Sequence, residues 1–137
     1  MSDYCFLNGK ILPFDKAIIN LDDLGVLRGH GVFEVLKTVN GKIFLFDEHF
    51  TRLKNSAEYL GIKLSYKKSE IEEIIKKLII KNKIKEAAIR IVLTGGRSFD
   101  AITLNYKTPT FYILVSEFNS LPEKLFKNGV NLKIIFY

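Results

Sequence analysis

The sequence predicts an α+β fold, with a mainly antiparallel sheet and two helices packed on one side. Two hairpins are the first observation behind this expectation. Segments 4–14 and 32–45 each consist of two apolar runs joined by an Asn-Gly pair, at Asn8-Gly9 and at Asn40-Gly41. Asn-Gly is typical of a two-residue turn in which both central residues adopt positive φ. Strands joined by such turns are antiparallel.

Two amphipathic segments predict the helices. From Asp47, a good N-cap, apolar residues recur at helical spacing until Gly61, which suits the position just after a helix end. A second segment begins at Ser69, whose spacing to Glu72 is that of a capping box, and continues to residue 79. A shorter helical turn is expected after the acidic pair Asp22-Asp23.

Two longer apolar runs, 87–94 and 109–116, predict two further strands of the same sheet. The segment that joins them, 95–108, is long for a connection between strands. Loops of this length inside a compact domain are more often functional than not. We therefore expect a binding role for part of this loop.

The C-terminal segment predicts a change of domain. A short helix or linker is expected from Pro122 to residue 128, and the apolar residues 130–137 predict a strand. Such a strand should have a partner, since an unpaired apolar edge invites aggregation. We divide the chain into an α+β domain (1–120), a linker (121–129) and the first strand of a second, cofactor-binding domain (130–137).

Composition excludes several classes of protein. At 137 residues and 47% hydrophobic, the chain suits one domain with a substantial core. The net charge of +6 comes from 17 lysines and four arginines, and eight lysines gather at 63–85 around one predicted helix. This pattern favours a solvated surface over a nucleic-acid interface. No apolar run approaches the roughly 20 residues that span a bilayer, and the N-terminus does not resemble a signal peptide. We expect an unprocessed cytoplasmic protein in which Cys5 is a buried hydrophobe.

One stretch, 23–53, carries most of the functional signal. It contains glycine-separated turns, a hairpin, and a helix with Arg52 in its first turns. Backbone amides and a fixed guanidinium together suit an anionic ligand. The alternative for Arg52 is a surface ion pair with an acid such as Glu48, one turn earlier.

The same stretch resembles the N-terminal half of the class IV aminotransferases. The resemblance lies in Asp23-Leu24-Gly25, in Gly29 to Glu34 (GHGVFE), in Asn40-Gly41 and in Glu48 to Leu53 (EHFTRL), and more weakly in Leu93 to Arg97. These are fold-type IV enzymes that use pyridoxal 5′-phosphate (PLP). The family includes branched-chain and D-amino acid aminotransferases and aminodeoxychorismate lyase. The resemblance implies the small N-terminal domain of such an enzyme, acting as a cytoplasmic homodimer in amino-acid metabolism.

The resemblance also implies roles for individual residues. Arg52 matches the arginine that binds the cofactor phosphate, and Phe33 stands where the family faces the substrate side chain, although a core aromatic is the alternative. Gly31 is expected to let the backbone pass close to a ligand, or to make a turn. Arg97 is a candidate for the substrate carboxylate, against a solvated loop arginine, and Arg28 is a candidate for substrate choice together with its neighbour His30. His49 suits helix capping or packing better than catalysis.

The family's Schiff-base lysine, and the carboxylate that pairs the pyridinium nitrogen, are expected beyond Tyr137, because Lys133 lies too early to match. No catalytic residue is therefore assigned within this chain. We expect transfer of an amino group between an amino acid, of branched-chain or D-type, and a 2-oxo acid by the intact parent, and no activity from these 137 residues alone. Two alternatives stay open: aminodeoxychorismate lyase, which eliminates pyruvate, and a non-catalytic binding module of half length.

Overall fold

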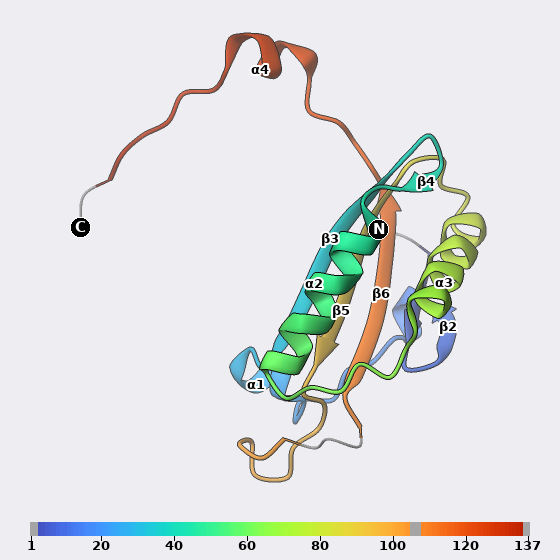
Figure 1. Cartoon of the computed structure of the whole chain (residues 1–137), viewed down its shortest axis with the longest axis vertical. Coiled ribbons are helices and arrows are strands. Elements are labelled where there is room, and N and C mark those ends of the chain that lie inside the picture. The colour runs from blue at the N-terminus through green and yellow to red at the C-terminus, as the bar shows by residue number, and fades with distance from the viewer. Residues whose placement is uncertain (1–2, 105–107, 136–137) are drawn as a thin grey trace.

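A computed structural model of the chain describes residues 3–104 and 108–135. Within these residues the core of the protein is a six-stranded sheet in the order β2-β1-β6-β5-β3-β4, with every neighbouring pair antiparallel (Figure 1). The strands are β1 (Tyr4–Leu7), β2 (Lys10–Pro13), β3 (Gly31–Val39), β4 (Lys42–Ile43), β5 (Ala87–Thr94) and β6 (Thr110–Glu117). The predicted α+β class and both hairpins are confirmed.

The two Asn-Gly turns have the geometry that their sequence predicts. Asn8 and Gly9 adopt φ of 44° and 91°, and Asn40 and Gly41 adopt 51° and 72°. Positive φ at both central residues matches the right-handed twist of the flanking strands. The second hairpin is shorter than expected, because Leu45 turns into the left-handed region (φ 49°) and ends the return strand after Ile43.

Two helices, α2 (Phe46–Tyr59) and α3 (Lys68–Lys81), cover one face of the sheet. Helix α2 packs on β3, and α3 packs on β1 and β6 (Figure 1). The buried side chains between the helices and the sheet form one apolar cluster, which includes Leu53, Ala57, Ile71, Ile75, Leu78, Ile89, Ile91, Phe111 and Ile113. The opposite face of the sheet has no helix of comparable length over it in the described part of the chain.

Both helices begin earlier than the sequence predicts. The N-cap of α2 is Leu45, so the prediction of Asp47 as N-cap is wrong, and Asp47 instead pairs with Lys68 of α3. The N-cap of α3 is Lys67, whose backbone N–H donates to the Glu70 carboxylate at 2.6 Å, so the predicted Ser69-Glu72 box is also wrong. Because α2 starts at Phe46, that aromatic ring is buried in the core. Burial of the ring stabilises this helix start over a later start with Asp47 as N-cap.

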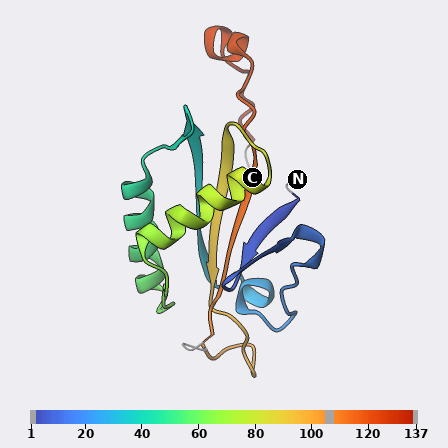
Figure 2. The same cartoon turned by 90° about the vertical axis from the view of Figure 1, so that its right-hand side faces the viewer.

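The short helix α4 (Glu123–Asn128) forms within the predicted linker. It lies beyond the end of the sheet, as Figure 2 shows, and the residues that follow it extend to one side of the sheet in Figure 1. The sequence predicts a strand over residues 130–137. Residues 130–135 form no strand and pair with none of the six strands. Residues 136–137 lie outside the described residues. The assignment of 130–137 to a second domain stays a prediction.

Gly96 tests the fold at the start of the long loop. Its φ is +71°, and an added Cβ would overlap the carbonyl oxygen of Thr108. Gly29 has a similar φ of +66°, but a Cβ there would meet open space. We expect Gly29→Ala to lower the free energy of unfolding by about 1 kcal/mol, from backbone strain alone. Gly96→Ala should lower it by about 3 kcal/mol, because overlap with the backbone adds to the strain. Urea denaturation of both variants measures the difference, and equal losses would contradict the packing described around Gly96.

Candidate functional site

Arg52 on α2 is paired with Glu34 on β3. The Arg52 Nε donates to Oε1 of Glu34 at 2.7 Å, and Nη2 donates to Oε2 at 2.6 Å. Glu34 points to the helix side of the sheet and is 3% exposed, whereas the Arg52 side chain is 67% exposed. The pair therefore joins a buried carboxylate to a guanidinium that reaches solvent. The alternative prediction, an ion pair of Arg52 with an acid such as Glu48, is wrong, because the acid that binds Arg52 is Glu34 on the strand beneath the helix.

His49 completes this group from one turn earlier on α2. Its Nδ1 lies 2.7 Å from Oε2 of Glu34. An ionised carboxylate only accepts, so Nδ1 carries a proton and donates it. Since Nδ1 is then a donor, its 3.4 Å approach to Nη2 of Arg52 is a contact between two donors. His49 thus braces the carboxylate, which fits the packing role expected for it.

The electrostatics of Glu34 follow from these contacts. Burial alone would raise the pKa of the carboxyl group. The hydrogen bonds and charges of Arg52, and then of His49, outweigh this effect and hold the pKa below its ordinary value of 4.5. In return, the bond to Glu34 raises the pKa of Arg52. Glu34 is therefore an anion at neutral pH despite its burial.

The solvent side of Arg52 opens on a polar groove. Thr51, Asn55 and Ser56 line the groove beside it on the same helix, together with the acidic residues Asp47 and Glu48. Among the residues that the structure describes, Nη1 of Arg52 makes no hydrogen bond. The guanidinium is thus held on one edge and free on the other, which suits an oxyanion such as phosphate.

Phe33 lies on the opposite face of the sheet from Glu34, because neighbouring residues of a strand point to opposite sides. Its ring is 65% exposed and borders a hollow whose lining includes Val26, Val92 and Tyr112. The alternative of a core aromatic is therefore not what the structure shows. Gly31 lines the same hollow, and a Cβ on it would meet the Leu93 carbonyl oxygen at 2.9 Å.

Arg90 is a charged residue of this open face that sequence reasoning missed. Arg90 faces Val35 across β3 and Leu114 across β6, so its exposed side chain shares the face of Phe33. In the described part of the chain Arg90 makes no ion pair. The signal was present in the run AAIRIVLT, where one arginine interrupts an otherwise apolar strand.

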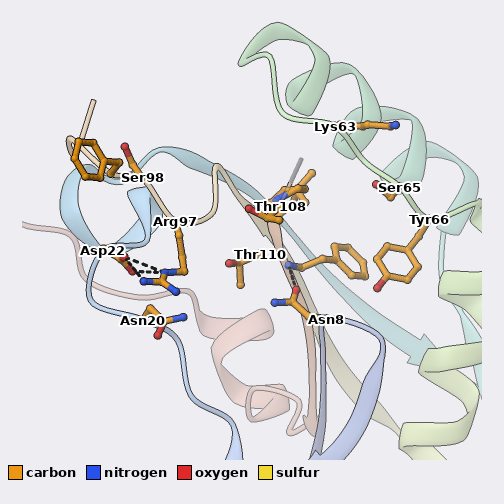
Figure 3. Close-up of a pocket in the computed structure, with 14 residues that line it drawn as sticks. Asn8, Asn20, Asp22, Lys63, Ser65, Tyr66, Arg97, Ser98, Thr108 and Thr110 are labelled. Carbon is orange, nitrogen blue, oxygen red and sulfur yellow. Dashed lines mark hydrogen bonds and ion pairs between the residues drawn. The ribbon is translucent and has the colours of Figure 1, made fainter. Parts of the chain in front are cut away.

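Arg97, in the loop that follows β5, is paired with Asp22. Its Nε lies 2.9 Å from both carboxylate oxygens, and Nη2 donates to Oδ2 at 2.7 Å. The hydrogen bond from Arg97 lowers the pKa of Asp22. The pair sits at the rim of a cavity of about 700 Å³ that Lys63, Ser65 and Tyr66 also line (Figure 3). Arg97 and Phe33 border different hollows, and Arg52 borders a third.

The buried carboxylate of Asp23 joins a short helix to strands β5 and β6 by hydrogen bonds. It caps α1 (Leu24–Arg28) by accepting from the Gly25 N–H at 2.8 Å, as the sequence predicts. It also accepts from the hydroxyl groups of Thr94 on β5 and Thr110 on β6. Arg28 lies exposed in the last turn of α1, and the Nε2 of the following His30 is buried with no hydrogen-bond partner among the described residues.

Other kinds of site are not visible in residues 3–104 and 108–135. These residues contain no cluster of three or more His, Cys, Asp or Glu side chains that could hold a metal ion. None of their helices combines the length and apolar character needed to cross a bilayer.

Comparison with known proteins identifies the family. The model of the class IV amino-transferase family matches residues 31–135. The chain belongs to this family. It is 35% identical over 132 residues to a "Probable branched-chain-amino-acid aminotransferase" of Rickettsia bellii, covering 96% of this chain and 44% of that protein. It is 36% identical over 91 residues to D-alanine aminotransferase of Staphylococcus aureus, covering 66% and 32%. The chain thus spans less than half the length of these relatives.

Solved structures give the same result for the fold. The branched-chain amino acid aminotransferase of Escherichia coli superposes with a TM-score of 0.80 at 22% identity, over 88% of this chain and 41% of that one. The branched-chain aminotransferase of the archaeon Thermoproteus uzoniensis, with norvaline, gives 0.73 at 24% identity, over 87% and 42%. "A hypothetical aminotransferase" from Mycobacterium tuberculosis in its PLP-bound form gives 0.68 at 25% identity, over 90% and 42%.

Glu34→Gln tests the electrostatics of the pair in this class IV aminotransferase chain. We expect it to lower the free energy of unfolding at neutral pH by about 1 kcal/mol, since charge-assisted hydrogen bonds become neutral ones and the guanidinium is well solvated. Glu34 has a lowered pKa in the folded state, so its contribution is full above the ordinary value of 4.5 and is lost as the pH falls through the folded value. Urea denaturation of both proteins between neutral and acid pH should show the gap closing below pH 4.5. A gap that is constant or widens in acid would contradict this assignment.

Proposed function

We propose that these residues form the N-terminal part of a PLP-dependent aminotransferase, which transfers an amino group between an amino acid and a 2-oxo acid. The observation that carries the proposal is the guanidinium of Arg52, fixed by Glu34 on one edge and free on the other. Membership of the class IV family supports it, because relatives of this family are branched-chain and D-alanine aminotransferases.

The free edge of the Arg52 guanidinium fits the phosphate end of PLP. A phosphate group accepts strong hydrogen bonds from a guanidinium, and the Arg52 Nη1 is available on the solvent side of α2. When bound, PLP supplies the electron sink that labilises bonds at the amino-acid α-carbon. This chain's contribution is to hold and orient the phosphate end, and the lysine that reacts with the cofactor is expected in the rest of the protein. The 137 residues alone are therefore expected to be inactive.

The open face of the sheet fits the substrate. The exposed Phe33 and Val35, with the half-buried Val92 beside Phe33, provide an apolar surface of the kind that accepts an aliphatic side chain. Arg90 and Arg97 are the two candidates on these elements for a substrate carboxylate. Arg90 is the better placed, because it shares the open face with Phe33 and Val35, whereas Arg97 borders a different hollow. A homodimer in the cytoplasm stays a prediction.

Incubation of the full-length protein with PLP, 2-oxoglutarate and a panel of L- and D-amino acids tests the proposal. We expect glutamate to form from at least one branched-chain or D-amino acid. Arg52→Gln should weaken PLP binding at least about tenfold, since one charge-assisted contact to the phosphate is lost. Absorbance of the cofactor during titration measures the affinity.

Two outcomes would contradict the proposal. Release of pyruvate from aminodeoxychorismate, with no amino transfer to any 2-oxo acid, would make the protein a lyase. Failure of the full-length protein to bind PLP would favour a non-catalytic module.

A further inference from the structure

We propose that Glu34 is a positioning residue for the phosphate contact of Arg52. The inference rests on the proposed function, because the anion in question is the cofactor phosphate. Its basis is the bidentate pair between a strand and a helix, in which a buried carboxylate holds an exposed guanidinium.

The geometry divides the guanidinium into two edges. Its five N–H donors lie in one plane. The Glu34 carboxylate occupies the Nε–H and one Nη2–H, at 2.7 Å and 2.6 Å. The donors that remain are on Nη1 and on the outer side of Nη2, on the edges of the guanidinium that Glu34 does not occupy. Removing Glu34 would return a long, exposed side chain to several rotamers.

Glu34 does not strengthen anion binding at Arg52 by its own charge. An anion bound at Arg52 would be repelled by a carboxylate on the same guanidinium, so Glu34 costs binding energy by charge alone. The carboxylate is nevertheless ionised and braced by His49 at 2.7 Å. Glu34 instead orients the guanidinium. Because one edge of the guanidinium is fixed, the other edge is preorganised for the phosphate before it binds.

The test compares PLP with pyridoxal, which lacks the phosphate, on the cofactor-free full-length protein. We expect Glu34→Gln to raise the Kd for PLP about tenfold and to leave the Kd for pyridoxal within about twofold. In an Arg52→Gln background, Glu34→Gln should have no further effect on PLP, since the two residues act through one contact. Equal losses for PLP and pyridoxal would overturn the proposal and leave Glu34 a structural residue.

Two further variants separate the positioning role of Glu34 from a general loss of charge or stability. Arg52→Lys retains the charge but presents no second edge for Glu34 to hold, so its PLP affinity should fall below that of wild type, although by less than that of Arg52→Gln, because an ammonium still attracts phosphate as a point charge. Glu86→Gln is the matched control. It removes a carboxylate that binds Thr38 and Gly41 at the other end of β3, and it should leave the ratio of PLP to pyridoxal affinity unchanged. Wild-type affinity in Arg52→Lys would overturn the positioning role.

An NMR measurement separates this inference from the proposed function. In the ligand-free protein, the Nε–H of Arg52 should exchange slowly with solvent, and Glu34→Gln should make the exchange fast. If wild type binds PLP no more tightly than pyridoxal, the assignment of the phosphate to Arg52 fails, even where slow exchange shows that Glu34 fixes the guanidinium. If wild type and Glu34→Gln both prefer PLP to the same degree, the positioning role alone fails.

Discussion

The carboxylate of Glu34, buried under α2, is the constraint on which the arrangement of the site depends. A buried carboxylate is tolerated only where its charge is met by hydrogen bonds and an opposite charge. Arg52 and His49, one turn apart on α2, meet both needs. The same contacts fix the rotation of α2 about its axis relative to β3. The helix cannot turn without leaving an unpaired charge in the core.

Strand β3 therefore serves two surfaces at once. The even-numbered Glu34, Leu36 and Thr38 are buried toward the helices, while Phe33 and Val35 lie on the open face. Because the alternation is strict, the carboxylate that holds Arg52 and the exposed apolar ring of Phe33 come from adjacent residues on opposite sides of one strand. Under the proposed function, PLP at Arg52 and a substrate at Phe33 would lie on opposite sides of β3 and would meet past its outer edge, which β4 covers only at Thr38 and Val39.

The turns and one helix cap were predictable from the sequence, whereas the caps of α2 and α3 and the distant pairings were not. Both Asn-Gly turns and the cap at Asp23 depend on neighbouring residues, and their geometry follows from backbone sterics. The partner of Arg97 lies 75 residues away at Asp22, and the partner of Arg52 lies across a hairpin. Such pairs depend on how α2 and the long loop dock on the sheet. Residue-type arguments could therefore select both arginines without finding what they bind in this structure, and they passed over Arg90 because it lies within a strand.

A crystal structure of the full-length protein with PLP tests the central claim most directly. We expect a phosphate oxygen within hydrogen-bond distance of the outer edge of the Arg52 guanidinium, with the inner edge still paired to Glu34. A phosphate bound away from Arg52, or an Arg52 that leaves Glu34 to reach it, would contradict the account.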